Sequence, residues 1–309
     1  SDLQPEGTAG AARPEIDRSP MPAETLGDRG FSEHFLSARD GLKLYFRLYG
    51  GGRRVPIPIL CLPGLSRNSK DFHDFARHMS GRFDVLCPDY RGVGRSAYAP
   101  TWRAYSPQAC LDDLRQVLAA TNRHRIVTVG TSFGGVLAAA LAVALPGAVA
   151  GAVLNDIGPG ASPGALDHVL AHVGKRRTFA SWEAAVGYLK STFPGMPAGS
   201  EERWRRIAAN TFREEDGCLT TDWDPAIAKP LPRLLRDSGD LWPLFRSLKK
   251  KRVLALRGAH SEVLGPATFD RMANELPRLE PITVPGVGHA PDMAEPPLLD
   301  LIERFLDGI

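Results

Sequence analysis

A serine between glycines offers the clearest chemistry in this sequence. Ser132 lies at the centre of Gly130-Thr131-Ser132-Phe133-Gly134, with an apolar run at 125–129 before it and small apolar residues at 135–141 after it. A strand, a G-x-S-x-G turn and a helix, in that order, form the setting in which a serine projects as a nucleophile. The glycines permit the sharp turn and close packing of the helix on the strand. We therefore interpret Ser132 as a nucleophile rather than an ordinary turn residue.

A serine hydroxyl is a poor nucleophile at neutral pH, so a base must accept its proton and a third group must orient that base. His289 follows Val284-Pro285-Gly286-Val287-Gly288, a glycine-rich loop directly after an expected strand. The order of serine first and histidine last along the chain is the order that this nucleophile turn usually accompanies. His289 is therefore the predicted base. The other histidines lie in helical or tail-like segments: His34, His73, His78, His124, His168, His172 and His260.

A turn at the end of an early strand can supply a hydrogen-bond donor for the oxyanion that serine attack creates. Cys61-Leu62-Pro63-Gly64-Leu65 ends an apolar run. Attack by a serine places negative charge on a carbonyl oxygen, and two preset N–H donors stabilise it. We predict that the backbone amides of Leu65 and Phe133 are these donors. Another glycine-rich stretch, Asp89 to Ser96, lacks the G-x-G-x-x-G spacing of dinucleotide sites, so we interpret it as a structural loop near the pocket.

These residues need a scaffold of strands and helices, and short apolar runs alternate with amphipathic segments from residue 33 onward, as in an α/β sheet. Between 157 and 247 strand-like runs disappear, helical segments follow one another, and four of the five tryptophans gather. We predict a flexible tail at 1–30, a core formed by 31–156 and 248–309, and a helical cap at 157–247. The expected strands are 33–38, 42–49, 57–62, 83–87, 125–129, 149–154, 252–256 and 279–284, and the expected helices are 71–79, 107–120, 135–141, 166–173, 182–189, 203–212 and 297–306.

Composition excludes several other classes. The net charge of +3 is too small and too scattered to predict nucleic-acid binding, and no stretch approaches the 18 apolar residues of a membrane span. The cysteines show neither C-x-x-C spacing nor nearby histidine pairs, which predicts no metal site and no disulfide framework: Cys61, Cys87, Cys110 and Cys218. We expect a cytoplasmic protein without metal or cofactor. The sequence leaves the oligomeric state open.

Four of the features described above together resemble the α/β-hydrolase superfamily, over about residues 32–309. They are the turn after residue 61, the Asp89–Ser96 stretch, the Ser132 turn and Gly288-His289. The resemblance implies a mostly parallel eight-stranded sheet flanked by helices, with the cap inserted over the pocket. Haloalkane dehalogenases and epoxide hydrolases of this superfamily use an aspartate at the turn, whereas this chain has a serine.

The resemblance leaves two carboxylates as the acid that orients His289. The family commonly places the acid three residues after a glycine, in the loop that here follows 253–256. Counting from Gly258, that position is Ser261, and Glu262 comes one residue later. Some esterases and lactonases of the superfamily instead use an acid at the strand end where this chain has Asp156. We favour Asp156, with Glu262 as the alternative.

The predicted activity is hydrolysis of a carboxylic ester or lactone through an acyl-enzyme, as in carboxylesterases (EC 3.1.1). The tryptophans of the cap indicate an apolar or aromatic substrate, although they would equally serve to pack the cap: Trp182, Trp204, Trp223 and Trp242. Hydrolysis of carbon–carbon bonds in ring-cleavage products, or of enol lactones, is the alternative within enzymes, and a cap arginine in the pocket (Arg176, Arg177 or Arg213) would favour it. A perhydrolase side reaction and a slow-turnover ligand sensor are further alternatives.

Overall fold

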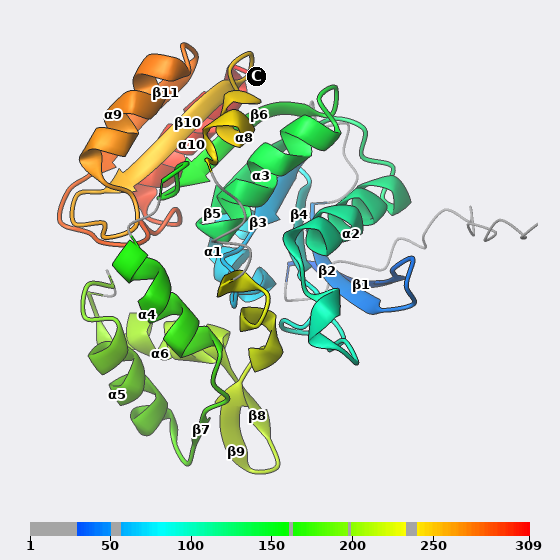
Figure 1. Ribbon diagram of the computed structural model, residues 1–309, viewed down its shortest axis with the longest axis vertical. Coiled ribbons are helices and arrows are strands. Elements are labelled where there is room, and N and C mark those ends of the chain that lie inside the picture. The colour runs from blue at the N-terminus through cyan, green and yellow to red at the C-terminus, as the bar shows by residue number, and fades with distance from the viewer. Residues whose placement is uncertain (1–29, 51–56, 161–162, 197–198, 233–239) are drawn as a thin grey trace, which may run out of the picture.

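A mostly parallel sheet of eight strands forms the centre of the protein, in the order β1-β2-β4-β3-β5-β6-β10-β11. The computed structural model describes residues 30–50, 57–160, 163–196, 199–232 and 240–309, so nearly all of the predicted tail lies outside the described residues (Figure 1). β2 pairs antiparallel with β1 and with β4, and the other neighbouring strands pair in parallel. The expected α/β-hydrolase fold is confirmed. The strands are β1 (Ser32–Ser37), β2 (Lys43–Tyr49), β3 (Ile59–Leu62), β4 (Val85–Asp89), β5 (Ile126–Thr131), β6 (Val149–Asn155), β10 (Arg252–Gly258) and β11 (Leu279–Val284).

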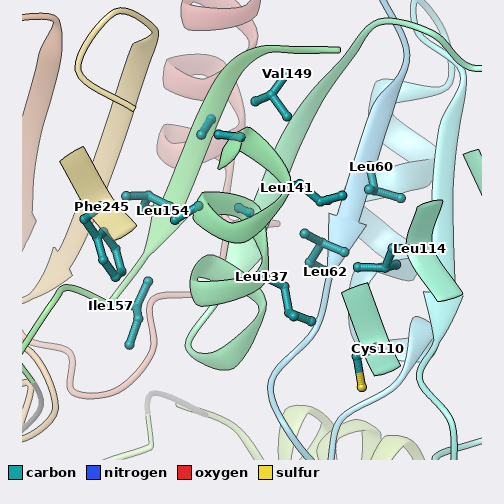
Figure 2. Packing of buried hydrophobic residues seen from close by; sticks show 14 of the residues in the cluster. Leu60, Leu62, Cys110, Leu114, Leu137, Leu141, Val149, Leu154, Ile157 and Phe245 are labelled. Carbon is teal, nitrogen blue, oxygen red and sulfur yellow. The ribbon is translucent and has the colours of Figure 1, made fainter. Parts of the chain in front are cut away.

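Helices cover both faces of this sheet because its central strands are apolar on both sides. Along β3, Leu60 and Leu62 face one helical layer, and Ile59 and Cys61 face the other. Figure 2 shows the first layer, in which Leu137 and Leu141 of α3 pack beside β3. This layer contains α2 (Pro107–Ala120), α3 (Phe133–Ala144), α8 (Trp242–Arg246) and α9 (Pro266–Glu275), and the opposite layer contains α1 (His73–Met79) and α10 (Pro296–Asp307).

Between β6 and α8 the chain leaves the sheet and builds a separate group of elements at one end of it (Figure 1). The predicted helices are present, but the expectation that this segment lacks strands is wrong, because three short strands form a second sheet in the order β7-β9-β8. These strands are only two to four residues long, so they leave little periodicity to read. Asp216 and Gly217 both have positive φ in the β8–β9 turn, and an Asp-Gly pair was a usable hairpin signal. The elements are α4 (Pro163–Val173), β7 (Thr178–Phe179), α5 (Trp182–Thr192), α6 (Glu201–Thr211), β8 (Phe212–Glu215), β9 (Cys218–Thr221) and the 3-10 turn η3 (Pro225–Ala228).

Two further findings bear on the excluded classes. Among the described residues, no helix combines the length and apolar character that crossing a bilayer requires. All four cysteines are free, and three of them are buried. Burial raises the pKa of the Cys110 thiol to about 12, which keeps it protonated and unreactive.

Candidate active site

Ser132 occupies the turn between β5 and α3, with backbone φ of 52° and ψ of −119°. A positive φ is strained for a residue with a side chain, and such strain persists only where the surroundings fix it. Its amide donates to the carbonyl of Asn155 at 3.1 Å, which ties the turn to the end of β6. A Cβ on Gly134 would lie 1.9 Å from the carbonyl oxygen of Leu62, so only glycine allows α3 to begin this close to β3. The local sequence thus forces the sharp turn that was expected around Ser132.

Asp156 and His289 meet beside this turn, although 133 residues separate them along the chain. Asp156 follows β6 directly, and its Oδ2 lies 2.6 Å from Nδ1 of His289, in the loop after β11. The carboxylate is fully buried, and the amide of Gly258 donates to its Oδ1 at 2.9 Å. The hydroxyl of Ser261 donates to Oδ2 at 2.5 Å. Three hydrogen-bond partners therefore satisfy a buried carboxylate, which would otherwise be costly to bury.

The order of the strands explains why Asp156 rather than Glu262 reaches His289. β10 pairs with β6 on one side and with β11 on the other, so the ends of all three strands lie together. A Cβ on Gly258 would lie 2.3 Å from the carbonyl oxygen of Gly288, which shows how closely the two loops approach. Glu262 is exposed, and the described residues show no hydrogen bond from it to His289. Sequence alone does not reveal this neighbour relation.

Tyr90 contacts both segments that carry the predicted amide donors. Its hydroxyl donates to the carbonyl of Pro63 at 2.9 Å, and its ring meets that of Phe133 edge-on at 5.7 Å between centroids. Burial raises the pKa of Tyr90 well above its usual value, so the hydroxyl stays a donor. Within the described part of the chain, the Leu65 amide has no backbone partner, and the Phe133 amide belongs to the first turn of α3, where N–H groups lack intrahelical acceptors. The glycine-rich loop that contains Tyr90 thus holds the segments of both predicted donors.

A cavity of about 730 Å³ lies over these groups, and Ser132, His289 and Leu65 are part of its lining. Its roof comes from α4, α5, α6 and the segment between α5 and α6, through Val169, His172, Val173, Leu189, Phe193, Met196, Arg203, Arg206, Ile207 and Asn210. His172 is nearly buried, and its Nδ1 lies 2.7 Å from the hydroxyl of Tyr188. The roof is therefore mostly apolar with a few polar groups, a composition suited to a small organic ligand.

The four cap-region tryptophans that we considered for substrate binding do not contribute to this lining. The indole of Trp223 is buried and donates to the carbonyl of Val173 at 2.8 Å, and Trp242 packs in the main core. Trp182 and Trp204 pack against a separate apolar cluster that α5, α6, β8 and β9 form. All four tryptophans therefore serve packing, and none of them lines the cavity that contains Ser132 and His289.

The arginines proposed for the pocket are also held away from it. Arg176 and Arg213 pair with Glu215, and Arg177 stacks over the ring of Tyr188 at 4.6 Å from its centroid. Arg203 and Arg206 of α6 line the cavity instead. Helical spacing in 201–211 places these two on one face, but the sequence did not show that this face turns toward the core.

Among the described residues, no group of three or more His, Cys, Asp or Glu side chains is arranged to hold a metal ion. What the arrangement offers is a serine in a strained turn, a histidine oriented by a buried carboxylate, and two amides beside them.

Comparison with known proteins agrees with this architecture. A model described as the alpha/beta hydrolase fold matches residues 57–293. A 3-hydroxybutyrate-oligomer hydrolase of Cupriavidus necator is 28% identical over 262 residues, covering 82% of this chain and 89% of that protein. A 2-(acetamidomethylene)succinate hydrolase of Mesorhizobium japonicum is 29% identical over 282 residues, covering 89% and 97%.

Among solved structures, an alpha/beta hydrolase from Novosphingobium aromaticivorans is 38% identical, with a TM-score of 0.86 over 92% of this chain and all of that one. The structure of an E-2-(acetamidomethylene)succinate hydrolase gives a TM-score of 0.77 at 26% identity, covering 90% and 99%. The family match spans more than two thirds of the chain and agrees with the fold. The chain belongs to the alpha/beta hydrolase family.

Proposed function

We propose that this protein is a serine hydrolase that cleaves a carboxylic ester or lactone through an acyl-enzyme. The observation that carries the proposal is the 2.6 Å contact between Asp156 Oδ2 and His289 Nδ1, in a cavity that Ser132 also lines. A proton held on Nδ1 by this carboxylate leaves Nε2 as the acceptor, which is the tautomer that a general base needs.

The reaction then runs in two halves. Ser132 Oγ attacks the carbonyl carbon while His289 Nε2 takes the hydroxyl proton, and the oxyanion accepts hydrogen bonds from the amides of Leu65 and Phe133. The tetrahedral intermediate collapses, and His289 returns the proton to the departing alkoxide, which leaves as the alcohol. Water, deprotonated by His289, attacks the acyl-enzyme and releases the acid and Ser132. No cofactor enters the proposal.

Among esters, we propose those whose acyl or alcohol part carries a free carboxylate. The cavity lining includes six Lys or Arg side chains (Arg47, Arg67, Lys70, Arg77, Arg203 and Arg206) against three aspartates (Asp71, Asp74 and Asp292). Glu295 and Asp222 offset part of this excess by pairing with Arg203 and Lys70. The names of the two relatives described above refer to carboxylate compounds, a hydroxybutyrate oligomer and a succinate.

Matched activated esters test both parts. We expect turnover of 4-nitrophenyl esters by the wild type, and a loss of about 10⁴-fold or more in kcat/KM for Ser132→Ala, because the nucleophile is gone. 4-Nitrophenyl hydrogen glutarate should exceed 4-nitrophenyl valerate in kcat/KM by about tenfold at low salt, with the difference shrinking as salt screens the cavity. Equal activity in Ser132→Ala would contradict the serine mechanism, and a preference for valerate would contradict the carboxylate class alone.

The same cavity favours one second candidate. Arg203 and Arg206 supply the cap cations that ring-cleavage products and enol lactones, which also carry carboxylates, would need. A wild type that hydrolyses such a carbon–carbon bond or enol lactone in a Ser132-dependent way, while ignoring both nitrophenyl esters, would favour this candidate.

A further inference from the structure

Ser261 stands three residues after the end of β10, next to the acid and the base. Its amide donates to the carbonyl of Gly258 at 3.0 Å, which closes a tight turn. Its hydroxyl lies 2.5 Å from Asp156 Oδ2, the same oxygen that lies 2.6 Å from His289 Nδ1. Two donors therefore converge on one carboxylate oxygen.

The hydrogen bonds within this loop determine the direction in which the Ser261 hydroxyl donates its proton. A hydroxyl has one proton to donate and two lone pairs that accept. The amides of Val263 and Leu264 donate to Ser261 Oγ at 3.2 and 3.0 Å and occupy its acceptor sites. The nearly buried side chain of Arg257 holds this loop in turn, because its Nε donates to the carbonyl of Leu264 at 2.8 Å. The proton of Ser261 therefore points at Asp156.

Both oxygens of the carboxylate are fixed as a result. The Gly258 amide holds Oδ1 at 2.9 Å, and Ser261 with His289 holds Oδ2. Without the Ser261 hydroxyl, Oδ2 would keep His289 as its one hydrogen-bond partner among the residues that the structure describes. The carboxylate would then be freer to rotate about its Cβ–Cγ bond, and the imidazole would rotate with it.

Building on the proposed function, we infer that Ser261 is a positioning residue that holds the Asp156 carboxylate in the orientation required by His289. It acts through Asp156 and touches no reacting atom. The Ser261 hydroxyl thereby fixes the position of the oxygen to which His289 Nδ1 is hydrogen-bonded.

The test compares Ser261→Ala with Ser261→Thr, which keeps the hydroxyl, and with Ser80→Ala. Ser80 is a matched control because its hydroxyl donates to the carbonyl of Arg77 at 2.7 Å, outside the site. For Ser261→Ala we expect kcat to fall about tenfold with KM nearly unchanged, the scale of one hydrogen bond to a charged group. Ser261→Thr and Ser80→Ala should follow the wild type.

Wild-type kcat in a folded Ser261→Ala protein would overturn the inference. So would a threonine variant as impaired as the alanine variant, since the hydroxyl would then be irrelevant. A fluorophosphonate probe separates this result from the proposed function, because labelling of the wild type but not of Ser132→Ala reports the nucleophile whatever Ser261 does. If the wild type is not labelled, the NMR signal of the proton between His289 Nδ1 and Asp156 Oδ2 still decides: a changed chemical shift in Ser261→Ala supports the inference, and an unchanged one overturns it.

Discussion

The floor of the cavity, where Ser132 and His289 lie, and its roof, which comes from α4, α5 and α6, are built in different ways. In the floor, backbone meets backbone at closest approach, with glycines where no Cβ fits, at Gly134 against Leu62 and at Gly258 against Gly288. The roof helices α5 and α6, together with the three-stranded sheet beside them, have a small apolar cluster of their own. This cluster is separate from the two large clusters of the core. Their junction with the floor includes many ion pairs and polar side chains.

Four contacts illustrate that polar junction. Arg203 of α6 pairs with Asp292 and Glu295, just beyond His289. Arg206 pairs with Asp74 of α1 at 2.6 Å, and Asn68 donates to the carbonyl of Asn210 at 3.0 Å. Such contacts are individually weak and exchange readily with water. Under the proposed function, we expect the floor to set the chemistry through fixed geometry and the roof to set which molecules enter and how tightly they bind.

The largest effect should come from the floor, by changing Asp156 to Asn. Asparagine tolerates the positive φ of 55° at this position, so the fold should survive. An amide cannot stabilise the imidazolium and favours the wrong tautomer of His289, and we expect kcat to fall by about 10⁴-fold. Steady-state kinetics beside Glu262→Gln provide the measurement. A collapse in Glu262→Gln with little change in Asp156→Asn would transfer the acid's role to Glu262.

One substitution made in both regions sharpens the contrast. Gly134→Ala would place a Cβ 1.9 Å from the Leu62 carbonyl oxygen, so the start of α3 must move, and we expect a loss of about 3 kcal/mol or more in unfolding free energy. Gly187→Ala in α5 meets nothing within 4 Å, and it should raise the unfolding free energy by about 0.5–1 kcal/mol through helix propensity. Urea unfolding measures both. Similar losses in the two variants would mean that the roof is as tightly fitted as the floor.

The sequence revealed those parts of the site whose geometry is local. Ser132 could be recognised because the strand, the turn and the helix are consecutive, and the Leu65 turn and His289 likewise directly follow strands. The choice between Asp156 and Glu262 stayed open because it depends on β10 lying beside β6, a neighbour relation that no local pattern encodes. Ser261 could be read only as a position without a carboxylate, since its partner lies 105 residues away.

The roof was less readable for a related reason. Amphipathic spacing located α4, α5 and α6, but it gave only the direction of each helix's apolar face relative to its own axis. Trp223 and Trp242 turned out to pack inward, and Arg203 turned toward the cavity, because the tertiary arrangement of the cap decides these directions. Functions that depend on the side chains of the roof could therefore not be predicted from local sequence patterns.

The smallest predicted effect belongs to the roof. Arg203→Met removes the pairs with Asp292 and Glu295 while keeping much of the apolar stem, and the Arg203 side chain is only 18% exposed. We expect KM for a carboxylate-bearing ester to rise about fivefold, corresponding to roughly 1 kcal/mol, with kcat changed less than about threefold. Arg205→Met, at an exposed position of the same helix, is the matched control and should leave both constants unchanged. If Arg203→Met instead lowered kcat with KM intact, the roof would share in orienting His289, and the division between a chemical floor and a selective roof would fail.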